Sequence, residues 1–483
     1  MSDMGFMDRE SKKRQLRRNI VQPPQEEHPS RYEEEDSEEV IRQVHRERRK
    51  KRILTTVMAV LFLTVTGFCF YKYQSEYEYT GYDVAWEKPM RHGGAESSPE
   101  SAPAAEEADT PESGADTEGA EASGDAADGG QEGAGEDGSQ PPQITPSKSV
   151  SESGFVKYAY FGENMIRYTK DGASYIDGAG RTVWTQSFEM KTPVINVNGD
   201  YAVIADQQGN QLYICSTAGC TGVARTQLPI TKAAVSSRGV TAAVVEDSTA
   251  CYIFYFKKDG EELGISIKML LSGDGYPVDL ALSPDGKQIV MSVMYMKNGT
   301  LKNKVVFYDF SEIGKNVNNR FIGGFEEEFD DKMAARVVYL NQETVCAFSD
   351  KGLTFISVKN VIPDSTVVTV PVEEEIKSIF YSDRYAGVVV ENGSGNPSRL
   401  DVYTADGKLA GTVDFDYDYA GVEIDGDRVI LYNEESCRVY SLDGHLKFQG
   451  QFDFSVSCVR QGKNHGNSLI VAGSEVMKEI KLK

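Results

Sequence analysis

The sequence predicts an all-β fold, namely a β-propeller of seven or eight four-stranded blades, and eight is the number we prefer. From about Phe155 onward, β-branched and aromatic residues alternate with polar ones in short runs, which is the period of half-buried strands. Asp-Gly, Asn-Gly and similar turns separate these runs. Groups of four runs recur every 35 to 50 residues or so, which is the spacing of propeller blades.

Each unit of the repeat contains two hairpins, and the second has a central Tyr or Phe before a turn that contains Gly. LDVYTADGKLAGTVDF, from Leu400, is an example. The last unit lacks an outer strand, and we expect residues 143–150, QITPSKSV, to supply it and so to join the two ends of the ring. We place the starts of the units near Phe155, Pro193, Ile230, Pro277, Ala334, Glu375, Tyr417 and Ser455.

One apolar run, residues 53–71, predicts a single transmembrane helix. It has no charged residue over 19 positions, and at about 1.5 Å per residue it spans roughly 30 Å, the thickness of a hydrocarbon core. Residues 42–52, just before it, hold seven basic residues and one acid, whereas the flank after it is mildly acidic. The positive-inside rule therefore places the N-terminus in the cytoplasm and the C-terminal part outside, at the cell membrane. A cleaved signal peptide fits poorly, because a long polar stretch precedes the run.

The composition divides the chain into five parts. Residues 1–52 form a disordered, charged cytoplasmic tail, in which residues 38–52 suit a short helix because opposite charges fall three and four apart. The transmembrane helix (53–71), a juxtamembrane segment (72–91) and a disordered acidic linker (92–150) follow, and residues 151–483 form the propeller.

The formal net charge of -23 is concentrated in the acidic linker. Between His92 and Ser147 there are 14 acids and no Lys or Arg, with no aromatic residue. Such a segment cannot bury enough apolar surface to offset the entropy of ordering. We expect it to be a stalk that holds the propeller away from the membrane, with an acidic partner-binding tract as the alternative. Nucleic acid is excluded as a partner, because an acidic domain repels phosphates.

The seven cysteines do not form a disulfide framework. Cys69 lies in the apolar run and six are scattered beyond it, without the spacing of a zinc site. We expect these six to be buried and unpaired, and the alternative is a local bridge between Cys215 and Cys220, which flank STAG in a predicted hairpin.

Two stretches carry a resemblance to known propellers. LALSPDGKQIVMSV, residues 280–293, resembles the SPDG strand-turn-strand element of WD-like propellers of the TolB type. YIDGAGRTVWTQSF, residues 175–188, resembles the D-x-x-x-G-x-x-x-W element of quinoprotein-like propellers, whose tryptophan packs between blades. Trp184 matches that tryptophan and is the only one in the predicted domain. The whole arrangement resembles a family of membrane-anchored bacterial proteins of unknown function, which implies an architecture and no activity.

The sequence offers few groups for catalysis. His445 and His465 both fall in predicted loops, and there is no GxSxG elbow, P-loop or dinucleotide signature. Quinoprotein dehydrogenase activity would need several copies of the tryptophan element, and this chain has one. We therefore assign no catalytic, cofactor-binding or metal-binding residues and predict no cofactor.

One acidic segment, DFDYDYAGVEIDGD, residues 414–427, has part of the pattern of a calcium-binding loop. Asp414, Asp416 and Asp418 have the spacing of the first three ligands, but Tyr419 stands where an EF-hand requires Gly. The alternation of acids with Phe or Tyr favours an outer strand, with acids toward water and rings toward the neighbouring blade.

A long insertion in the fourth unit, residues 297–331, is the predicted partner surface, because long loops on rigid scaffolds often carry binding. Its end, EEEFDDKMAAR, residues 326–336, is predicted as a loop.

These observations together predict a binding or scaffold module rather than an enzyme. We expect a single-pass, membrane-anchored propeller outside the cytoplasm that binds an envelope protein, a cell-wall component or another surface ligand. The alternatives are a hydrolase or lyase with Asp, Tyr and Arg residues at the central channel, and a transmembrane ligand sensor. We rank the sensor last, because a flexible stalk transmits conformational change poorly.

Overall fold

The computed structural model describes residues 31–90, 155–358, 365–392, 398–462 and 467–483. Helix α2 (Arg31–Glu76) contains the predicted apolar run, and its part Arg48–Tyr73 is long and apolar enough to cross a membrane. The helix begins much earlier than the sequence predicted. Residues 31–52, which we assigned to a disordered tail, are helical, and the short charged helix expected over 38–52 is one part of α2. Residues 1–30 of the predicted tail lie outside the described residues.

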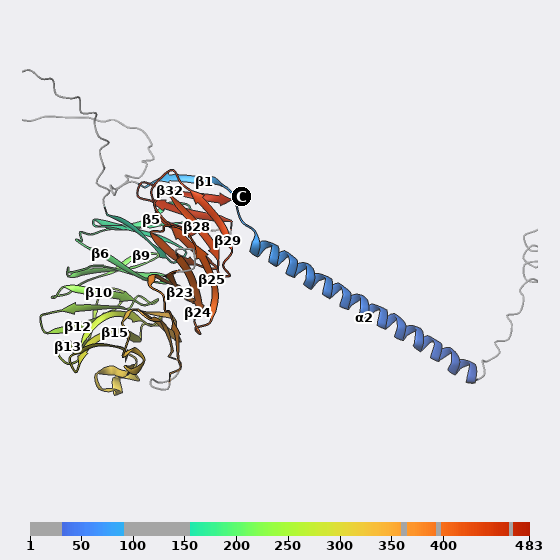
Figure 1. Ribbon diagram of the computed structural model, residues 1–483, viewed down its shortest axis with the longest axis horizontal. Helices are drawn as coiled ribbons and strands as arrows, with labels where there is room; N and C mark the ends of the chain where they lie inside the picture. Colours follow the sequence, from blue (N-terminus) through green and yellow to red (C-terminus); the bar gives the residue numbers. More distant parts are fainter. Residues whose placement is uncertain (1–30, 91–154, 359–364, 393–397, 463–466) are drawn as a thin grey trace, which may run out of the picture. The chain divides into compact units, whose positions relative to one another are not determined.

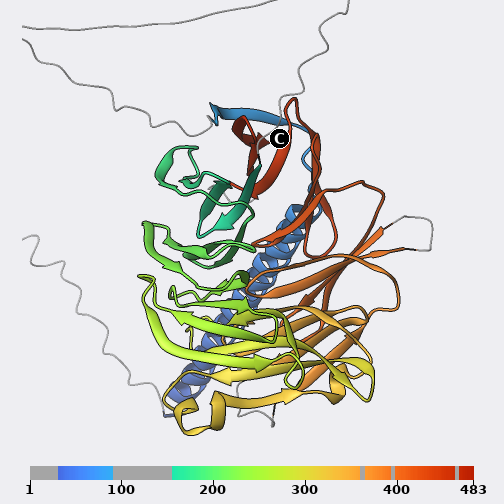
Figure 2. The same ribbon diagram turned by 90° about the vertical axis from the view of Figure 1, so that its left-hand side faces the viewer.

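Eight four-stranded antiparallel sheets form the blades of a propeller, which confirms the predicted fold and the preferred number of blades. Figure 1 labels several of the strands, and Figure 2 shows the same blades turned by 90°. In blades 1 to 7, four consecutive strands pair in chain order. Strands begin at Pro193, Ile230 and Ala334, where units were predicted to start.

The strands of blades 1 to 4, each blade from its first to its fourth strand, are as follows. They are β2 (Val156–Phe161), β3 (Asn164–Thr169), β4 (Gly172–Ile176) and β5 (Thr182–Ser187); β6 (Pro193–Asn198), β7 (Tyr201–Asp206), β8 (Gln211–Ser216) and β9 (Gly219–Arg225); β10 (Ile230–Val235), β11 (Thr241–Glu246), β12 (Ala250–Phe256) and β13 (Glu262–Leu270); β14 (Tyr276–Leu282), β15 (Gln288–Lys297), β16 (Thr300–Asp309) and β17 (Phe321–Phe325).

Blades 5 to 7 follow the same plan, and blade 8 contributes three strands from the C-terminal end. They are β18 (Ala334–Asn341), β19 (Thr344–Ser349), β20 (Gly352–Ser357) and β21 (Val367–Pro371); β22 (Ile376–Tyr381), β23 (Tyr385–Glu391), β24 (Ser398–Thr404) and β25 (Leu409–Phe415); β26 (Gly421–Asp425), β27 (Arg428–Tyr432), β28 (Ser436–Ser441) and β29 (Leu446–Gln451); β30 (Val456–Gln461), β31 (Ser468–Gly473) and β32 (Val476–Leu482).

The fourth strand of blade 8 is β1 (Tyr82–Pro89), and this corrects the sequence prediction. β1 pairs antiparallel with β32, with Tyr82 opposite Leu482 and Pro89 opposite Val476. The predicted closing strand, QITPSKSV, lies outside the described residues. The ring is therefore joined by a segment that comes directly after α2, before the acidic stretch.

The position of β1 moves the boundary of the propeller. Part of the predicted juxtamembrane segment, 72–91, belongs to the ring, and only residues 77–81 separate α2 from β1. The acidic linker, 92–150, lies outside the described residues, but in the chain it connects β1 of blade 8 with β2 of blade 1. It is therefore an insertion between two strands of the propeller, and the interpretation as a stalk between membrane and propeller does not hold.

The antiparallel order of the strands gives the ring two faces. We call the face that carries the turns between first and second strands, and between third and fourth strands, the upstream face, because β1 begins there. The downstream face carries the turns between second and third strands and the connections from blade to blade. β1 ends at this face, since a fourth strand runs from the upstream to the downstream side.

The core lies in the seams between neighbouring blades. Eight hydrophobic clusters of described residues each combine side chains from two adjacent blades. In the seam between blades 8 and 1, for example, Met165 and Ile176 pack with Cys458, Ile470 and Met477. Each sheet thus buries both faces against its neighbours, which is how a propeller distributes its core.

The recurrent turns that contain Gly have a packing role in these seams. Gly180 has a φ of +68°, and a Cβ added there would lie 2.6 Å from the ring of Trp86 on β1. Gly444 has a φ of +93°, and its Cβ would lie 2.5 Å from the carbonyl oxygen of Thr412 on β25. In both places the outer strand of one blade passes over the turn of the next blade, where only glycine fits.

Candidate functional site

The first strands of blades 3 to 6 carry one cluster of charged residues. The Lys232 Nζ and Arg336 Nη1 atoms lie 3.3 and 3.5 Å from Asp279 Oδ1. Asp279 is buried, and its Oδ2 accepts a hydrogen bond of 3.0 Å from the backbone N–H of Val337. Arg336 also donates to the hydroxyl of Tyr381 at 2.9 Å. The carboxylate is therefore satisfied by two cations and a backbone amide.

The first strands of blades 7, 8 and 1 carry a second cluster. Arg460 Nε lies 3.4 Å from Asp425 Oδ2, and the guanidinium lies 4.9 Å from the ring centroid of Tyr160. Arg460 also donates to the carbonyl oxygen of Gly162 in blade 1 at 2.9 Å. Burial, together with the charge of nearby Asp425, raises the pKa of Glu423 to about 7.

These polar residues follow a pattern that links one blade to the next. The Asp279 carboxylate accepts from Val337 N–H in the following blade, and the Asp425 carboxylate accepts from Gln461 N–H at 2.8 Å. Asn196 Oδ1 does the same for Val235 N–H at 2.9 Å. Three seams thus use one polar side chain of an inner strand to fix the position of the next inner strand.

Cys215 and Cys220 form a disulfide bond, which differs from the unpaired state that we expected. The two residues are opposite each other across the β8–β9 hairpin, so the short STAG turn brings their sulfur atoms together. The expectation of buried, unpaired thiols holds for four others. They are Cys251, Cys346, Cys437 and Cys458.

Of the two histidines considered from the sequence, the structure describes His445. His445 lies in the turn between β28 and β29, is about half exposed, and has its Nε2 3.8 Å from Asp443. His465 lies outside the described residues. Within the described ranges no group of three or more His, Cys, Asp or Glu residues is placed to hold a metal ion.

The segment 414–419 has the alternation that favoured an outer strand over a calcium loop. β25 ends at Phe415, and Asp416 and Asp418 are exposed. The hydroxyl of Tyr417 donates to the carbonyl oxygen of Ser436 at 2.9 Å. Both Tyr417 and Tyr419 pack on the cluster between blades 6 and 7. The acids thus face water and the rings face the blades, although the strand is shorter than predicted.

Trp184 packs between blades, as the resemblance implied. Its ring stacks on Tyr175 with centroids 5.9 Å apart, and its Nε1–H donates to the Thr217 carbonyl oxygen of blade 2 at 3.1 Å. It is not the only tryptophan of the propeller, because Trp86 on β1 takes part in the seam between blades 8 and 1. Sequence analysis missed Trp86, since the composition placed it on the membrane side of the acidic stretch.

Blade 4 differs from the other blades in two additions, and they account for the predicted insertion at 297–331. On the downstream side, β15 and β16 are ten residues long. Residues 295–302 pair with each other, beyond the last pairs with β14 and β17, and so form a projecting hairpin. Met296 and Leu301, directly opposite each other near its tip, are 65% and 49% exposed.

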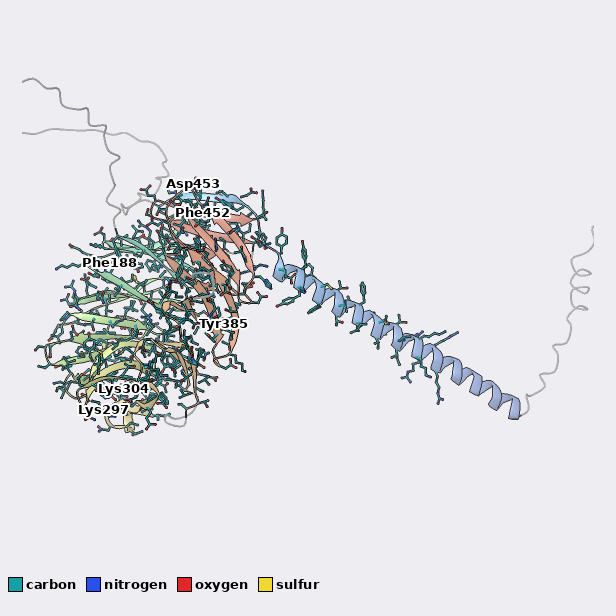
Figure 3. All side chains as sticks on the ribbon, in the orientation of Figure 1. Phe188, Lys297, Lys304, Tyr385, Phe452 and Asp453 are labelled. Atoms are coloured by element: carbon teal, nitrogen blue, oxygen red, sulfur yellow. A yellow bond between two sulfur atoms is a disulfide. The ribbon has the colours of Figure 1, made fainter. Side chains whose placement is uncertain are left out.

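Ion pairs link both strands of this hairpin to the connection that follows β17. Lys297 Nζ lies 3.5 Å from Glu326 and Lys302 Nζ lies 3.0 Å from Asp330. The ammonium of Lys304 lies 4.7 Å from the ring centroid of Tyr295. Figure 3 labels Lys297, beside the tip of the hairpin, and Lys304, just below its base. The connection contains the short 3-10 helix η3 (Glu327–Phe329), and β18 begins at Ala334, so the predicted loop at 326–336 is only partly irregular.

The second addition of blade 4 lies on the upstream side, between β16 and β17. It contains η1 (Gly314–Asn316) and η2 (Asn318–Arg320), and Ile313 is 73% exposed. A shallow depression of about 550 Å³ lies beside it, lined by Asp285, Gln288, Asp309, Phe310 and Gln342 among others. The predicted partner surface is thus divided between the two faces of the ring.

The comparisons with known proteins give a family and several similar folds. Residues 141–482 match a family described as "Family of unknown function (DUF5711)". No curated protein matches the sequence. Solved structures similar to the chain include Sqt1 from Chaetomium thermophilum, at 11% identity and a TM-score of 0.46, with 69% of this chain and 97% of that chain covered.

Two further structures are similar at the same level. The Dos1 propeller has 11% identity and a TM-score of 0.45, with 68% of this chain and 93% of that one covered. Hydrazine synthase from Kuenenia stuttgartiensis has 14% identity and a TM-score of 0.37, with coverages of 71% and 98%.

Proposed function

The chain belongs to the DUF5711 family of unknown function, and we propose that it is a single-pass, membrane-anchored propeller that binds an envelope protein or a cell-wall component outside the cytoplasm. In this role the propeller is a scaffold with no reaction of its own. The proposal goes beyond the family, whose description assigns no activity.

The observation that carries the proposal is the connection between α2 and the ring. The chain passes from a helix with an apolar stretch to the closing strand of blade 8 over residues 77–81 only. Within that connection, Tyr79 forms an isolated parallel β-bridge with Phe448 of blade 7. An anchor that continues into the closing strand of a folded domain is what a membrane-held scaffold requires.

Two further observations support a location outside the cytoplasm. Residues 42–52 carry seven basic residues before the apolar stretch, which favours a cytoplasmic N-terminus. The Cys215–Cys220 disulfide is typical of an oxidising compartment, where such bonds persist. The thiols of the four remaining cysteines of the propeller are buried, so they are protected from mixed disulfides in that compartment.

The arrangement of polar residues supports binding rather than catalysis. Catalytic acids and bases need a site where reacting groups converge on a substrate. The acids Asp279 and Asp425 instead accept hydrogen bonds from the backbone of the next blade. Their role in assembling the ring accounts for the burial of Asp279 and for the pairing of both acids.

A second candidate, a transmembrane ligand sensor, gains support from the same connection. We ranked it last because a long stalk transmits conformational change poorly. The acidic segment, however, lies after β1, and α2 is continuous from Arg31 to Glu76. Only residues 77–81 lie between α2 and β1, so a conformational change in blade 8 has a short stretch of backbone through which to reach the helix.

Cysteine labelling in intact cells tests the location. Thr300→Cys places a thiol at the exposed hairpin tip, and Arg46→Cys places one on the charged side of the apolar stretch. We expect a membrane-impermeant maleimide to label T300C in intact cells and R46C only after permeabilisation. The reverse pattern would exclude a propeller outside the cytoplasm.

Proximity labelling from the C-terminus tests the scaffold role. The full chain is compared with a chain that ends at Glu76, and both are quantified by mass spectrometry. We expect selective enrichment of a few envelope proteins by the full chain. Identical backgrounds from the two chains would contradict a stable protein partner and direct the search to glycans or to a catalytic site.

A further inference from the structure

We propose that the segment between β16 and β17 of blade 4, residues 310–320, contacts the lipid surface of the membrane that holds α2. We call this segment the upstream insertion. The inference rests on the proposed membrane anchor and goes beyond it, because it assigns a lipid-binding surface to the propeller itself. The contact gives the ring a second point of attachment, at a distance from the anchor.

Apolar side chains are exposed on and beside the upstream insertion. Ile313 is 73% exposed, more than any other large hydrophobic side chain among the described residues, and Val317 is 36% exposed. Phe321, the first residue of β17, is 43% exposed. The insertion is also longer than the connection between third and fourth strands in the other blades of the ring. Several exposed apolar side chains within one short added segment indicate an interaction surface.

A short connection limits how far the upstream face can lie from the membrane. α2 ends at Glu76, about one helical turn beyond the apolar run that ends at Tyr71. The backbone N–H of Tyr79 then donates to the carbonyl oxygen of Lys447, at the upstream end of β29, at 2.7 Å. The backbone from Glu76 to Tyr79 reaches at most about 11 Å. The upstream edge of the ring is therefore held near the lipid headgroups when α2 spans the membrane.

Blade 4 lies opposite blade 8 in the ring. The hydrophobic clusters join each blade to the next and blade 8 to blade 1, so blade 4 is equally far from blade 8 in either direction. The upstream insertion connects a third strand to a fourth, so it lies on the same face as the start of β1. A lipid contact at blade 4 therefore complements the anchor at blade 8 and holds the upstream face along the membrane.

The charges of this region balance, so its apolar side chains decide the occupant. The insertion and the depression beside it hold acids and bases in equal number, namely Asp285, Asp309 and Glu312 with Lys287, Lys315 and Arg320. Glu312 pairs with Lys315, Asp285 pairs with Lys287, and Asp309 is buried. Burial of Ile313 and Val317 at the headgroup boundary is thus the favourable term, and no anionic lipid is required. A weak contact suffices, because the anchor already holds the ring at the membrane.

Site-specific photocrosslinking of the full chain in native membranes tests the proposal. A photoreactive residue replaces Ile313, and the matched control replaces Met296, which is 65% exposed on the downstream hairpin of the same blade. Mass spectrometry identifies and quantifies the adducts. We expect at least fivefold more lipid adduct at position 313 than at position 296. Equal yields of lipid adduct, or a protein as the main adduct at position 313, would overturn the proposal.

A second arm separates an apolar contact from mere closeness to the membrane. The full chain is placed in phosphatidylcholine vesicles with the photoreactive residue at Val317. Ile313→Glu should lower the yield of lipid adduct at least fivefold, because a charged side chain opposes burial in the bilayer, whereas Met296→Glu should leave it unchanged. Added phosphatidylglycerol should change the yield less than twofold. Insensitivity to I313E, or a requirement for phosphatidylglycerol, would contradict the apolar contact.

A photoreactive residue at Leu61, inside the apolar stretch of α2, distinguishes failure of this inference from failure of the proposed anchor. Lipid adducts at position 61 without lipid adducts at position 313 would overturn the contact at blade 4 and leave the anchor standing. The absence of lipid adducts at both positions would contradict the anchor and, with it, the contact at blade 4.

Discussion

Blade 8 and blade 4 use their additional residues in opposite ways. Blade 8 has three strands from the C-terminal end and obtains its fourth, β1, from a segment on the other side of the acidic stretch. The aromatic rings of β1 are partly buried: the ring centroids of Tyr82 and Phe448 lie 6.1 Å apart, and Trp86 packs on the Gly180 turn of blade 1. Blade 4 is complete without its additions, and these leave Met296, Leu301 and Ile313 exposed.

The difference indicates which part of the ring serves stability and which serves recognition. In a closed ring every seam contributes to the core, so a missing strand at the closure weakens two seams. An addition that contacts only its own blade contributes little to folding and is free to serve binding. Four experiments test this division, from the largest expected effect on stability to the smallest.

Removal of β1 should have the largest effect. A chain that begins at Glu76 keeps β1, whereas a chain of residues 141–482, the range matched by the family, lacks it. Loss of the strand exposes the side chains of Met477 and Ile480 and removes Trp86 from the seam. We expect the shorter chain to lose at least about 3 kcal/mol of unfolding free energy or to aggregate. Urea denaturation measures this, and equal midpoints would show that β1 does not hold the ring closed.

A glycine pair separates seam packing from backbone strain. Gly180 and Gly264 both have positive φ values of about 60° to 70°, but only at Gly180 would a Cβ meet a neighbour, the ring of Trp86. Gly264→Ala should cost about 1 kcal/mol from backbone strain alone. Gly180→Ala should cost about 1 to 3 kcal/mol more, because it also displaces β1. Similar melting temperatures for the two variants would contradict the contact between blades 8 and 1.

The pH dependence of stability tests the partly buried carboxyl of Glu423 in blade 7. The pKa of Glu423 is about 7 in the folded chain and near 4.5 in its ordinary state. The folded state therefore binds this proton more tightly than the unfolded state does. The stabilising contribution of Glu423 is fully present below about pH 4.5 and falls as the pH rises toward 7. We expect this group to contribute a loss on the order of 2 kcal/mol across that range.

Glu423→Gln should remove that contribution and raise the melting temperature at pH 8 relative to the unmodified chain. The measurement is thermal unfolding at several pH values, with the exposed Glu163→Gln as the control. A difference between E423Q and the unmodified chain that does not change with pH would contradict the raised pKa.

Changes at the hairpin tip of blade 4 should have the smallest effect on stability. Met296→Ser combined with Leu301→Ser removes apolar surface that is already exposed, so the free energy of unfolding should change by less than about 0.5 kcal/mol. Urea denaturation of the double variant measures this. A loss comparable to that of Gly180→Ala would mean that blade 4 also depends on its addition for folding.

Sequence reasoning located most of the propeller because its signals are local. Alternation of apolar and polar residues and the Asp-Gly turns are contained within each hairpin, so the blade starts at Pro193, Ile230 and Ala334 were readable. The contribution of Trp184 to a seam was also expected, because residues 175–188 resemble an element of quinoprotein-like propellers whose tryptophan packs between blades. The predicted insertion at 297–331 was found as excess length, although its division between two faces was not.

The errors concern contacts between residues distant in the chain or choices that local patterns leave open. β1 pairs with β32, which lies near the other end of the chain in sequence. No local feature of the segment YDVAWEKP indicates which strand it pairs with. The abrupt change to an acidic composition after residue 91 suggested a domain boundary where the structure has a connection. The disulfide depended on the exact register of β8 and β9, which places Cys215 opposite Cys220.

The sequence by itself determined the fold class, the four-strand repeat and the single apolar stretch, because each follows from the periodicity of neighbouring residues. Only the tertiary structure decided how the ring closes, which seams the two tryptophans occupy and which side of blade 4 carries the exposed hairpin. These depend on pairing between strands that are far apart in the chain. The free energy of such pairing comes from burial in the seams, which exist only after the blades have assembled.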